Sequence, residues 1–203
     1  KSWIQVTESS ELSPTKVIDE EAISLIKQSL DNTQKLYKYS LKDSTQTALV
    51  EDLIVGYHTW INTEKVALAI LENQGLSLNI YNTNTKENET VVTNIGRSLH
   101  KIPKSELISY IDKSESQWNI KSFDPSTKKS ELIINVLENS EDVFWTAQGV
   151  LITGVNNMIY KFNPKQDEDW VKIGTLSNKS ISNITRISIN NETSKLAIVV
   201  DVE

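Results

Sequence analysis

Residues 35–43 read KLYKYSLKD, a short alternating stretch in which the aromatic Tyr39 stands just before a polar turn. An aromatic residue stands at the same point in three later stretches: LNIYNTNTK (78–86), NIKSFDPSTKK (119–129) and MIYKFNPKQ (158–166). Successive aromatic residues are 42, 42 and 39 positions apart. A fixed period near 40 residues is typical of a repeat architecture, in which similar units stack on one another.

A second set of positions repeats with the same period. Steps of 42, 43 and 42 residues separate its members, which are Trp60, Ile102, Trp145 and Ile187. Between these landmarks, short runs of β-branched and aromatic residues alternate with polar ones, a pattern that favours strands. Four strands in each unit of about 40 residues predict the blades of a β-propeller, each blade being a small twisted antiparallel sheet.

Two alternatives compete with this interpretation. Residues 17–30, VIDEEAISLIKQSL, also place apolar residues at helical spacings, although the part from Ala22 onward alternates and the repeat favours a strand. A large β-sandwich would produce the same strand signals, and would require the agreement of the repeat positions to be accidental.

The repeat predicts one all-β domain over residues 1–203, with four complete four-stranded blades and a partial blade at each end. Residues 1–11 are expected to form the last strand of a preceding blade, and residues 181–203 the inner strands of a closing blade. The complete blades are expected at 12–53, 54–95, 96–139 and 140–180.

Composition excludes several classes of protein. The chain has 203 residues, a net charge of −6 and no basic stripe, so a nucleic-acid partner is not expected. No apolar run reaches the length of a membrane span. Cysteine is absent, which rules out a disulfide framework and a thiolate zinc site.

Four stretches resemble TolB-like propellers, also called WD-like repeat proteins: ESSELSPTKVIDEE (8–21), GYHTWINTEKVAL (56–68), GRSLHKIPKSELISYID (96–112) and ITRISINNETSKLAIVV (184–200). The resemblance is to secreted or periplasmic members of unknown function, and it implies a periplasmic or secreted location. In that family the innermost strand of a blade ends in a Ser-Pro-Asp-Gly-Lys turn. This chain has no Asp-Gly pair, so its individual turn types are expected to differ.

TolB-like propellers usually have six blades, and the resemblance therefore implies that this chain is a fragment of a six-bladed ring. The missing part would amount to about one and a half blades. An open ring would leave two unpaired blade faces, which favour aggregation or pairing with another chain.

No catalytic motif is recognisable. The chain lacks a G-x-S-x-G elbow, an HExxH helix, an EF-hand loop, a Walker loop and a G-x-G-x-x-G turn. The sequence therefore predicts no catalytic residues, no metal site and no cofactor. Its acidic residues lie mostly in turns, where a solvated rim is expected.

Residues 56–60 (GYHTW) and 96–100 (GRSLH) are similar, and they contain the only two histidines of the chain, His58 and His100. Both are expected near the central channel, at the start of the first strands of consecutive blades. Polar and aromatic residues in equivalent positions complete a candidate ligand site at the channel mouth, which comprises Tyr57, His58, Trp60, Arg97, Ser98, His100, Asp142 and Trp145. The alternative is structural: the histidines bond a neighbouring blade, and Trp60 and Trp145 pack between blades.

The leading functional hypothesis is a non-catalytic interaction platform that binds a protein, a peptide or a glycan at the channel mouth. A sensor or regulatory propeller of a larger hydrolase is the second hypothesis. A calcium-dependent propeller enzyme of the lactonase kind is the third.

Overall fold

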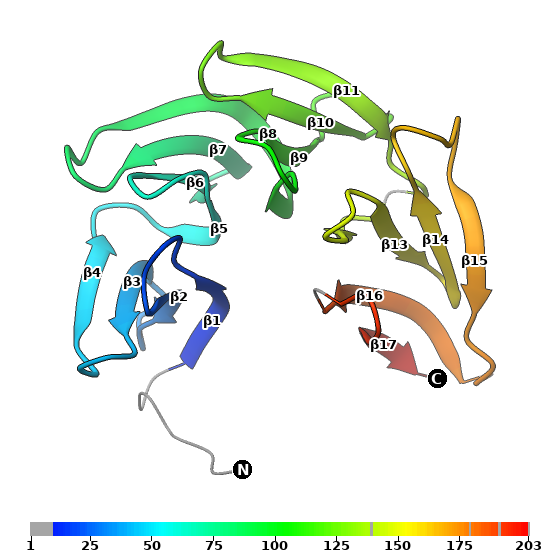
Figure 1. The fold of residues 1–203 in the computed structure, drawn as a ribbon, viewed down its shortest axis with the longest axis horizontal. Coiled ribbons are helices and arrows are strands. Elements are labelled where there is room, and N and C mark those ends of the chain that lie inside the picture. Colours follow the sequence, from blue (N-terminus) through cyan, green and yellow to red (C-terminus); the bar gives the residue numbers. More distant parts are fainter. Residues whose placement is uncertain (1–9, 139, 179, 191, 203) are drawn as a thin grey trace. The chain divides into compact units, whose positions relative to one another are not determined.

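The computed structural model describes residues 10–138, 140–178, 180–190 and 192–202. The chain divides into two compact units that join between Ile95 and Gly96, and each unit is described by itself. Every regular element of the described residues is a β-strand, and the sheets are antiparallel (Figure 1). The predicted all-β class is therefore confirmed. Residues 1–9, which hold most of the predicted strand at 1–11, lie outside the described part of the chain.

The first unit contains two antiparallel sheets. Four strands form the first sheet in chain order: β1 (Ser10–Lys16), β2 (Ala22–Gln28), β3 (Gln34–Ser40) and β4 (Gln46–Val50). The second sheet consists of β5 (Val55–Trp60), β6 (Lys65–Glu72), β7 (Gly75–Asn82) and the first part of β8 (Asn88–Lys101), which pairs with β7 as far as Ile95. The stretch from Ala22 is thus a strand and not a helix, as the repeat predicted.

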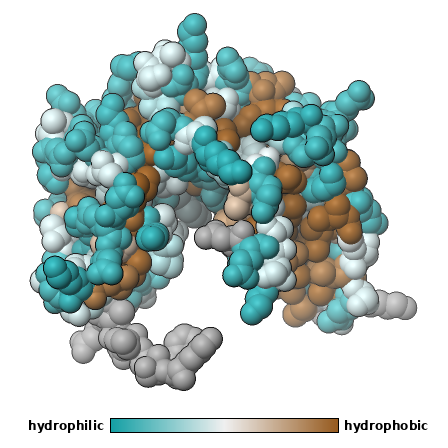
Figure 2. All heavy atoms as spheres, viewed as in Figure 1, coloured by the Kyte–Doolittle hydropathy of each residue, from teal (hydrophilic) through white to brown (hydrophobic). Residues whose placement is uncertain are grey.

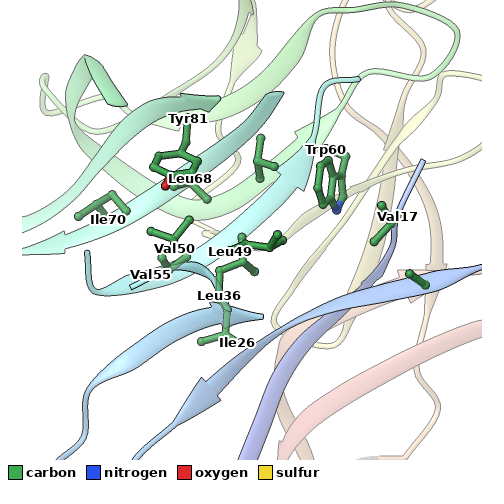
Figure 3. Packing of buried hydrophobic residues seen from close by; sticks show 12 residues of the cluster. Val17, Ile26, Leu36, Leu49, Val50, Val55, Trp60, Leu68, Ile70 and Tyr81 are labelled. Atoms are coloured by element: carbon green, nitrogen blue, oxygen red, sulfur yellow. The ribbon is translucent and has the colours of Figure 1, made fainter. Parts of the chain in front are cut away.

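The core of the first unit lies between these two sheets. Alternating apolar residues from β2, β3 and β4 meet apolar residues from β5, β6 and β7 (Figure 3). Leu36, Val55 and Leu68 are completely buried within this cluster. An apolar face of a sheet must be buried against another layer, and here each sheet buries one against the other.

The second unit begins within β8, whose residues 96–101 neighbour β9. The remaining strands of this sheet are β9 (Ile108–Asp112), β10 (Asn119–Asp124) and β11 (Lys129–Asn135). The next four-stranded sheet consists of β12 (Val143–Trp145), β13 (Leu151–Val155), β14 (Met158–Phe162) and β15 (Val171–Thr175). A pair of strands follows, β16 (Ile181–Ile189) and β17 (Leu196–Val202).

Two apolar clusters hold the sheets of the second unit together. One joins Ile111 and Ile120 to Trp145 and Leu151 across two successive sheets. The other joins Ile152 of β13 to residues of β16, and Figure 2 shows apolar atoms at the surface over these strands. Each sheet therefore buries its face against the next, which is how blades of a propeller are stabilised.

The turns after the first strands use several residue types where the TolB-like pattern has Asp-Gly. A backbone with positive φ occurs at Asp19, Lys104, Gly149 and Thr193 in four of the five turns. In the remaining turn, the Asn62 side chain accepts hydrogen bonds from the backbone N–H groups of Glu64 and of Lys65, the first residue of β6. The left-handed conformation is thus kept with little glycine, at a modest cost in backbone energy.

The four aromatic residues that revealed the period are all buried. They are Tyr39, Tyr81, Phe123 and Phe162. Each lies at or near the end of its strand, and the next residue begins the turn. Asn82, Asp124 and Asn163 close three of these turns by accepting a hydrogen bond from a backbone N–H two residues further on. Core packing thus explains these aromatic residues, as the repeat predicted.

Gly154 of β13 marks a close approach between two sheets of the second unit. A Cβ atom at this position would lie 2.7 Å from Cβ of Ile184 on β16, and closer still to its Cγ2. We expect Gly154→Ala to lower the free energy of unfolding by about 1–3 kcal/mol, because the added methyl group overpacks this contact. Thermal unfolding followed by circular dichroism measures the effect. Gly174→Ala is the matched control, since a Cβ there would meet nothing within 4 Å. Equal melting temperatures for the two variants would show that the contact is adaptable.

The predicted division into blades at 12–53, 54–95, 96–139 and 140–180 stays a prediction, as does the six-bladed parent ring. No helix of the described residues is long and apolar enough to cross a membrane.

Candidate functional site

Three residues of the predicted site lie on β5 in the first unit. His58 and Trp60 are buried, whereas Tyr57 is partly exposed. The side chains of His58 and Trp60 meet at one hydroxyl group, that of Ser24 on β2. Nε2 of His58 lies 2.7 Å from Oγ of Ser24, and the indole N–H of Trp60 donates to the same oxygen at 2.9 Å. Ser24 is itself completely buried.

His58 is neutral in this environment. Burial removes the ring from water and lowers its pKa to about 4. Its other ring nitrogen, Nδ1, is buried and has no hydrogen-bond partner among the described residues. A Ser–His pair of this kind lacks both solvent access and a third group to orient the ring, so it does not form a nucleophilic dyad.

The second unit repeats the tryptophan contact. The indole N–H of Trp145 on β12 donates to Oγ of Ser109 on β9 at 2.7 Å, and both residues are buried. In each unit the donor and acceptor residues are 36 positions apart and belong to successive sheets. We refer to Trp60–Ser24 and Trp145–Ser109 as the two indole latches. They agree with the structural explanation of both tryptophans.

His100 lies on the part of β8 that belongs to the second unit. It is partly buried, and its ring meets the edge of Phe144 with the ring centres 5.5 Å apart. Desolvation lowers its pKa to about 4, and an interaction with the backbone of Val143 opposes the shift. Both histidines are therefore uncharged at neutral pH.

Ser98 and Asp142 fix the backbone around the start of β12. The Ser98 hydroxyl donates to the carbonyl of Glu141 and accepts from the N–H of Val143. The Asp142 carboxylate accepts a hydrogen bond from the backbone N–H of Ile187 at 2.5 Å. Burial raises the pKa of Asp142, and this hydrogen bond opposes the shift. Both residues thus position loops and strands around the pocket described next.

Arg97 lines a polar cavity of about 470 Å³ in the second unit, which we call the Arg97 pocket. Its polar walls come from β8, from the segment between β11 and β12, from the turn after β13 and from β16. The residues that carry these walls include Arg97, Glu138, Glu141, Asn156, Asn183 and Thr185. Arg97 is the one member of the predicted site that lines this cavity.

The electrostatics of the pocket centre on Glu141. Its carboxylate accepts a short hydrogen bond from the ammonium group of Lys113 and lies 4.0 Å from Nε of Arg97. Within the described part of the chain, the Arg97 guanidinium donates one hydrogen bond, from Nη2 to the carbonyl of Thr185 at 2.8 Å. Its Nε is buried without a hydrogen-bond partner among the described residues. Two cations thus share one carboxylate, and the guanidinium keeps unused donors.

The structure separates the predicted residues into different environments. Tyr57, His58 and Trp60 belong to one unit, whereas Arg97, Ser98, His100, Asp142 and Trp145 belong to the other. Their role in binding a ligand stays a prediction. Sequence reasoning missed Glu138, Asn156 and Asn183, because polar residues in loops, in turns and near strand ends carry no periodic signal. Within the described ranges, no group of three or more His, Asp or Glu side chains could hold a metal ion.

Comparisons with known proteins give a fold and no close relative. No family model matches the chain, and no curated protein matches its sequence. Solved structures do match. A structure of a nidogen/laminin complex is similar with a TM-score of 0.71 and 9% identity, covering 95% of this chain and 72% of that chain. TolB from Acinetobacter baumannii is similar with a TM-score of 0.68 and 11% identity, covering 95% of this chain and 55% of that chain.

The fold is that of a TolB-like β-propeller. A structure of a puromycin hydrolase mutant in complex with PGG is also similar, with a TM-score of 0.68 and 11% identity. The match covers 94% of this chain but 34% of that one. The chain thus spans about half of the A. baumannii TolB chain and about a third of the hydrolase chain. The predicted propeller fold and the resemblance to TolB-like propellers are confirmed.

Proposed function

We propose that this propeller is a non-catalytic interaction module that binds a protein or peptide through the Arg97 pocket. The proposal includes the periplasmic or secreted location that the resemblance implies. One observation carries it: a guanidinium group with unused donors lines a cavity with mixed polar walls. Pockets of this size accommodate a small ligand or an anchoring segment of a larger partner.

A carboxylate group of the partner is the expected contact of Arg97. The guanidinium presents several N–H donors in one plane, a geometry that matches a carboxylate in a two-point contact. Glu141 does not neutralise the positive charge of this region, because Lys113 already binds it. A protein complex among the similar structures, the nidogen/laminin complex, supports partner binding by this fold.

A second candidate function is that of a regulatory propeller attached to a hydrolase. The similarity to one third of the puromycin hydrolase chain favours it, because that chain is much longer than the matched propeller part. The gene that encodes this chain tests the second candidate: an adjoining hydrolase segment supports it, and its absence counts against it. No observation on the described residues favours the third hypothesis, the calcium-dependent enzyme.

A prediction follows for Arg97→Met. We expect the wild-type protein to bind a subset of random heptapeptides with free carboxyl termini on a synthetic array, and the variant to bind these at least about tenfold more weakly. Loss of a charged hydrogen bond costs about 1.5–3 kcal/mol, which corresponds to that reduction or more. Biolayer interferometry on the selected peptides measures the affinities.

The matched control is Arg186→Met, because Arg186 is the other arginine of the chain and donates to the same Thr185 carbonyl without lining the pocket. It is expected to keep binding. Unchanged melting temperatures establish that both variants are folded. The proposal fails if no peptide binds or if both variants behave like the wild type. If the protein binds on a parallel glycan array and on no peptide, its ligand is a saccharide and not a peptide.

A further inference from the structure

The Arg97 pocket is lined by opposite charges that differ in exposure. The Arg97 side chain is partly buried and its Nε is covered, and the buried residues Gly154 and Ile184 line the same pocket. The exposed rim carries the carboxylate of Glu138 and the amides of Asn156 and Asn183. A ligand in this pocket can therefore reach two exposed amides, an exposed carboxylate and a partly buried cation in one lining.

The carboxylate of Glu138 makes one long hydrogen bond among the described residues. The Asn156 amide donates to Oε2 of Glu138 across 3.5 Å, at the limit of a hydrogen bond, and no ion pair of Glu138 occurs among the described residues. Asn183 in turn accepts the backbone N–H of Asn156 through Oδ1, which leaves its amide N–H groups for another acceptor. The backbone carbonyl of Asn156 is occupied, because it accepts from the N–H of Ile184.

The charge count supports a ligand with two opposite charges. Glu141 is bound by Lys113 and faces Arg97, whereas the Asp142 carboxylate interacts with both Arg97 and Arg186. With both carboxylates ionised, these groups together carry one positive charge. Glu138 at the rim adds one negative charge. A purely anionic ligand would be repelled by Glu138, and a purely cationic one by Arg97.

We propose that the Arg97 pocket takes a small zwitterion, a free amino acid or a short peptide with both termini free. The carboxylate binds Arg97 and the ammonium group binds Glu138. The amides of Asn156 and Asn183 face the polar groups between the two termini. The proposal rests on the function proposed above and narrows its ligand from any carboxylate-bearing partner to one that also presents a free amino group.

Isothermal titration with trialanine tests the proposal. The comparison ligands are free alanine, N-acetyl-trialanine, trialanine amide and maltotriose. We expect trialanine to bind and each capped form to bind at least about tenfold more weakly, since each lacks one charged contact. Alanine binding as tightly as trialanine identifies a free amino acid as the ligand, whereas weaker binding of alanine identifies a peptide.

Two variants test which residue binds each terminus of the peptide. Glu138→Gln is expected to bind trialanine and N-acetyl-trialanine equally, and Arg97→Met to bind trialanine and its amide equally. Glu131→Gln is the matched control for the acidic variant, because Glu131 is an exposed residue of β11 outside the pocket. It should discriminate against N-acetyl-trialanine as the wild type does.

The outcomes separate this inference from the proposed function. Equal binding of trialanine and its capped forms, binding of maltotriose alone, or no binding at millimolar concentration overturns the zwitterion proposal. If peptides from the array still require Arg97 in that case, the interaction module stands without the zwitterion. If neither trialanine nor any array peptide depends on Arg97, both proposals fail.

Discussion

The variant Trp60→Ala is expected to lose about 3–5 kcal/mol of unfolding free energy, the range found when a buried aromatic side chain is truncated. Trp60 is 4% exposed and belongs to the apolar core of the first unit. Its removal leaves a cavity between two sheets and takes away the donor that Ser24 accepts from. Urea unfolding followed by far-ultraviolet circular dichroism measures the loss.

Smaller substitutions separate the hydrogen bond of the latch from its packing. Trp60→Phe keeps most of the ring volume but removes the N–H, and Ser24→Ala removes the acceptor and leaves a buried N–H unpaired. Each is expected to cost about 1–3 kcal/mol. The double variant should cost less than the sum, because the two residues share one contact.

Tyr37→Ala on β3, a partly buried aromatic, is the control. A cost below about 1 kcal/mol for Trp60→Ala would contradict the latch.

The two latches show how far the repeat could be read from the sequence. One position of the repeat is occupied in turn by Trp60, Ile102, Trp145 and Ile187. This regular spacing was sufficient to predict strands and blades. Their partners were not predicted, because each partner lies on a different sheet. The residue types agree once the structure is known: the tryptophans meet serines, whereas Ile187 meets Ile152 in an apolar cluster. A buried indole N–H needs an acceptor, so a serine 36 residues before each tryptophan was a usable signal.

The candidate site was predictable only in part, for the same physical reason. Arg97 was expected near a binding site because it begins an inner strand, and strand order follows from the repeat. Glu138, Asn156 and Asn183 come from an irregular segment, a hairpin turn and the start of β16. Their polar side chains are what any exposed turn would contain, and only the folded backbone places them around one cavity. The structure also shows a contact of His58 that the sequence did not predict: its ring bonds the buried hydroxyl of Ser24.

The second large effect is expected from pH. Burial lowers the pKa of His58 to about 4, against 6.5 for a free histidine. In the unfolded chain this residue binds a proton as the pH falls below 6.5, whereas in the folded chain it stays neutral until about pH 4. The unfolded state therefore binds more protons in this window, so the free energy of unfolding falls as the pH falls. His58 alone should account for a loss of roughly 3 kcal/mol between pH 7 and pH 4.

Other groups modify this profile without changing its sign between pH 6.5 and 4. The pKa of His100 is also lowered to about 4 by desolvation, so it adds to the loss. Asp142, whose pKa is raised by burial, stabilises the fold more when it is protonated and opposes the loss near the acidic end. His58→Gln isolates the contribution of His58, because glutamine does not titrate and can still bond Ser24. Urea unfolding at pH 7, 5.5 and 4.5 should show a shallower pH dependence for this variant than for the wild type. Parallel profiles would mean that His58 has the same pKa in the folded and unfolded chain, and that burial does not lower it.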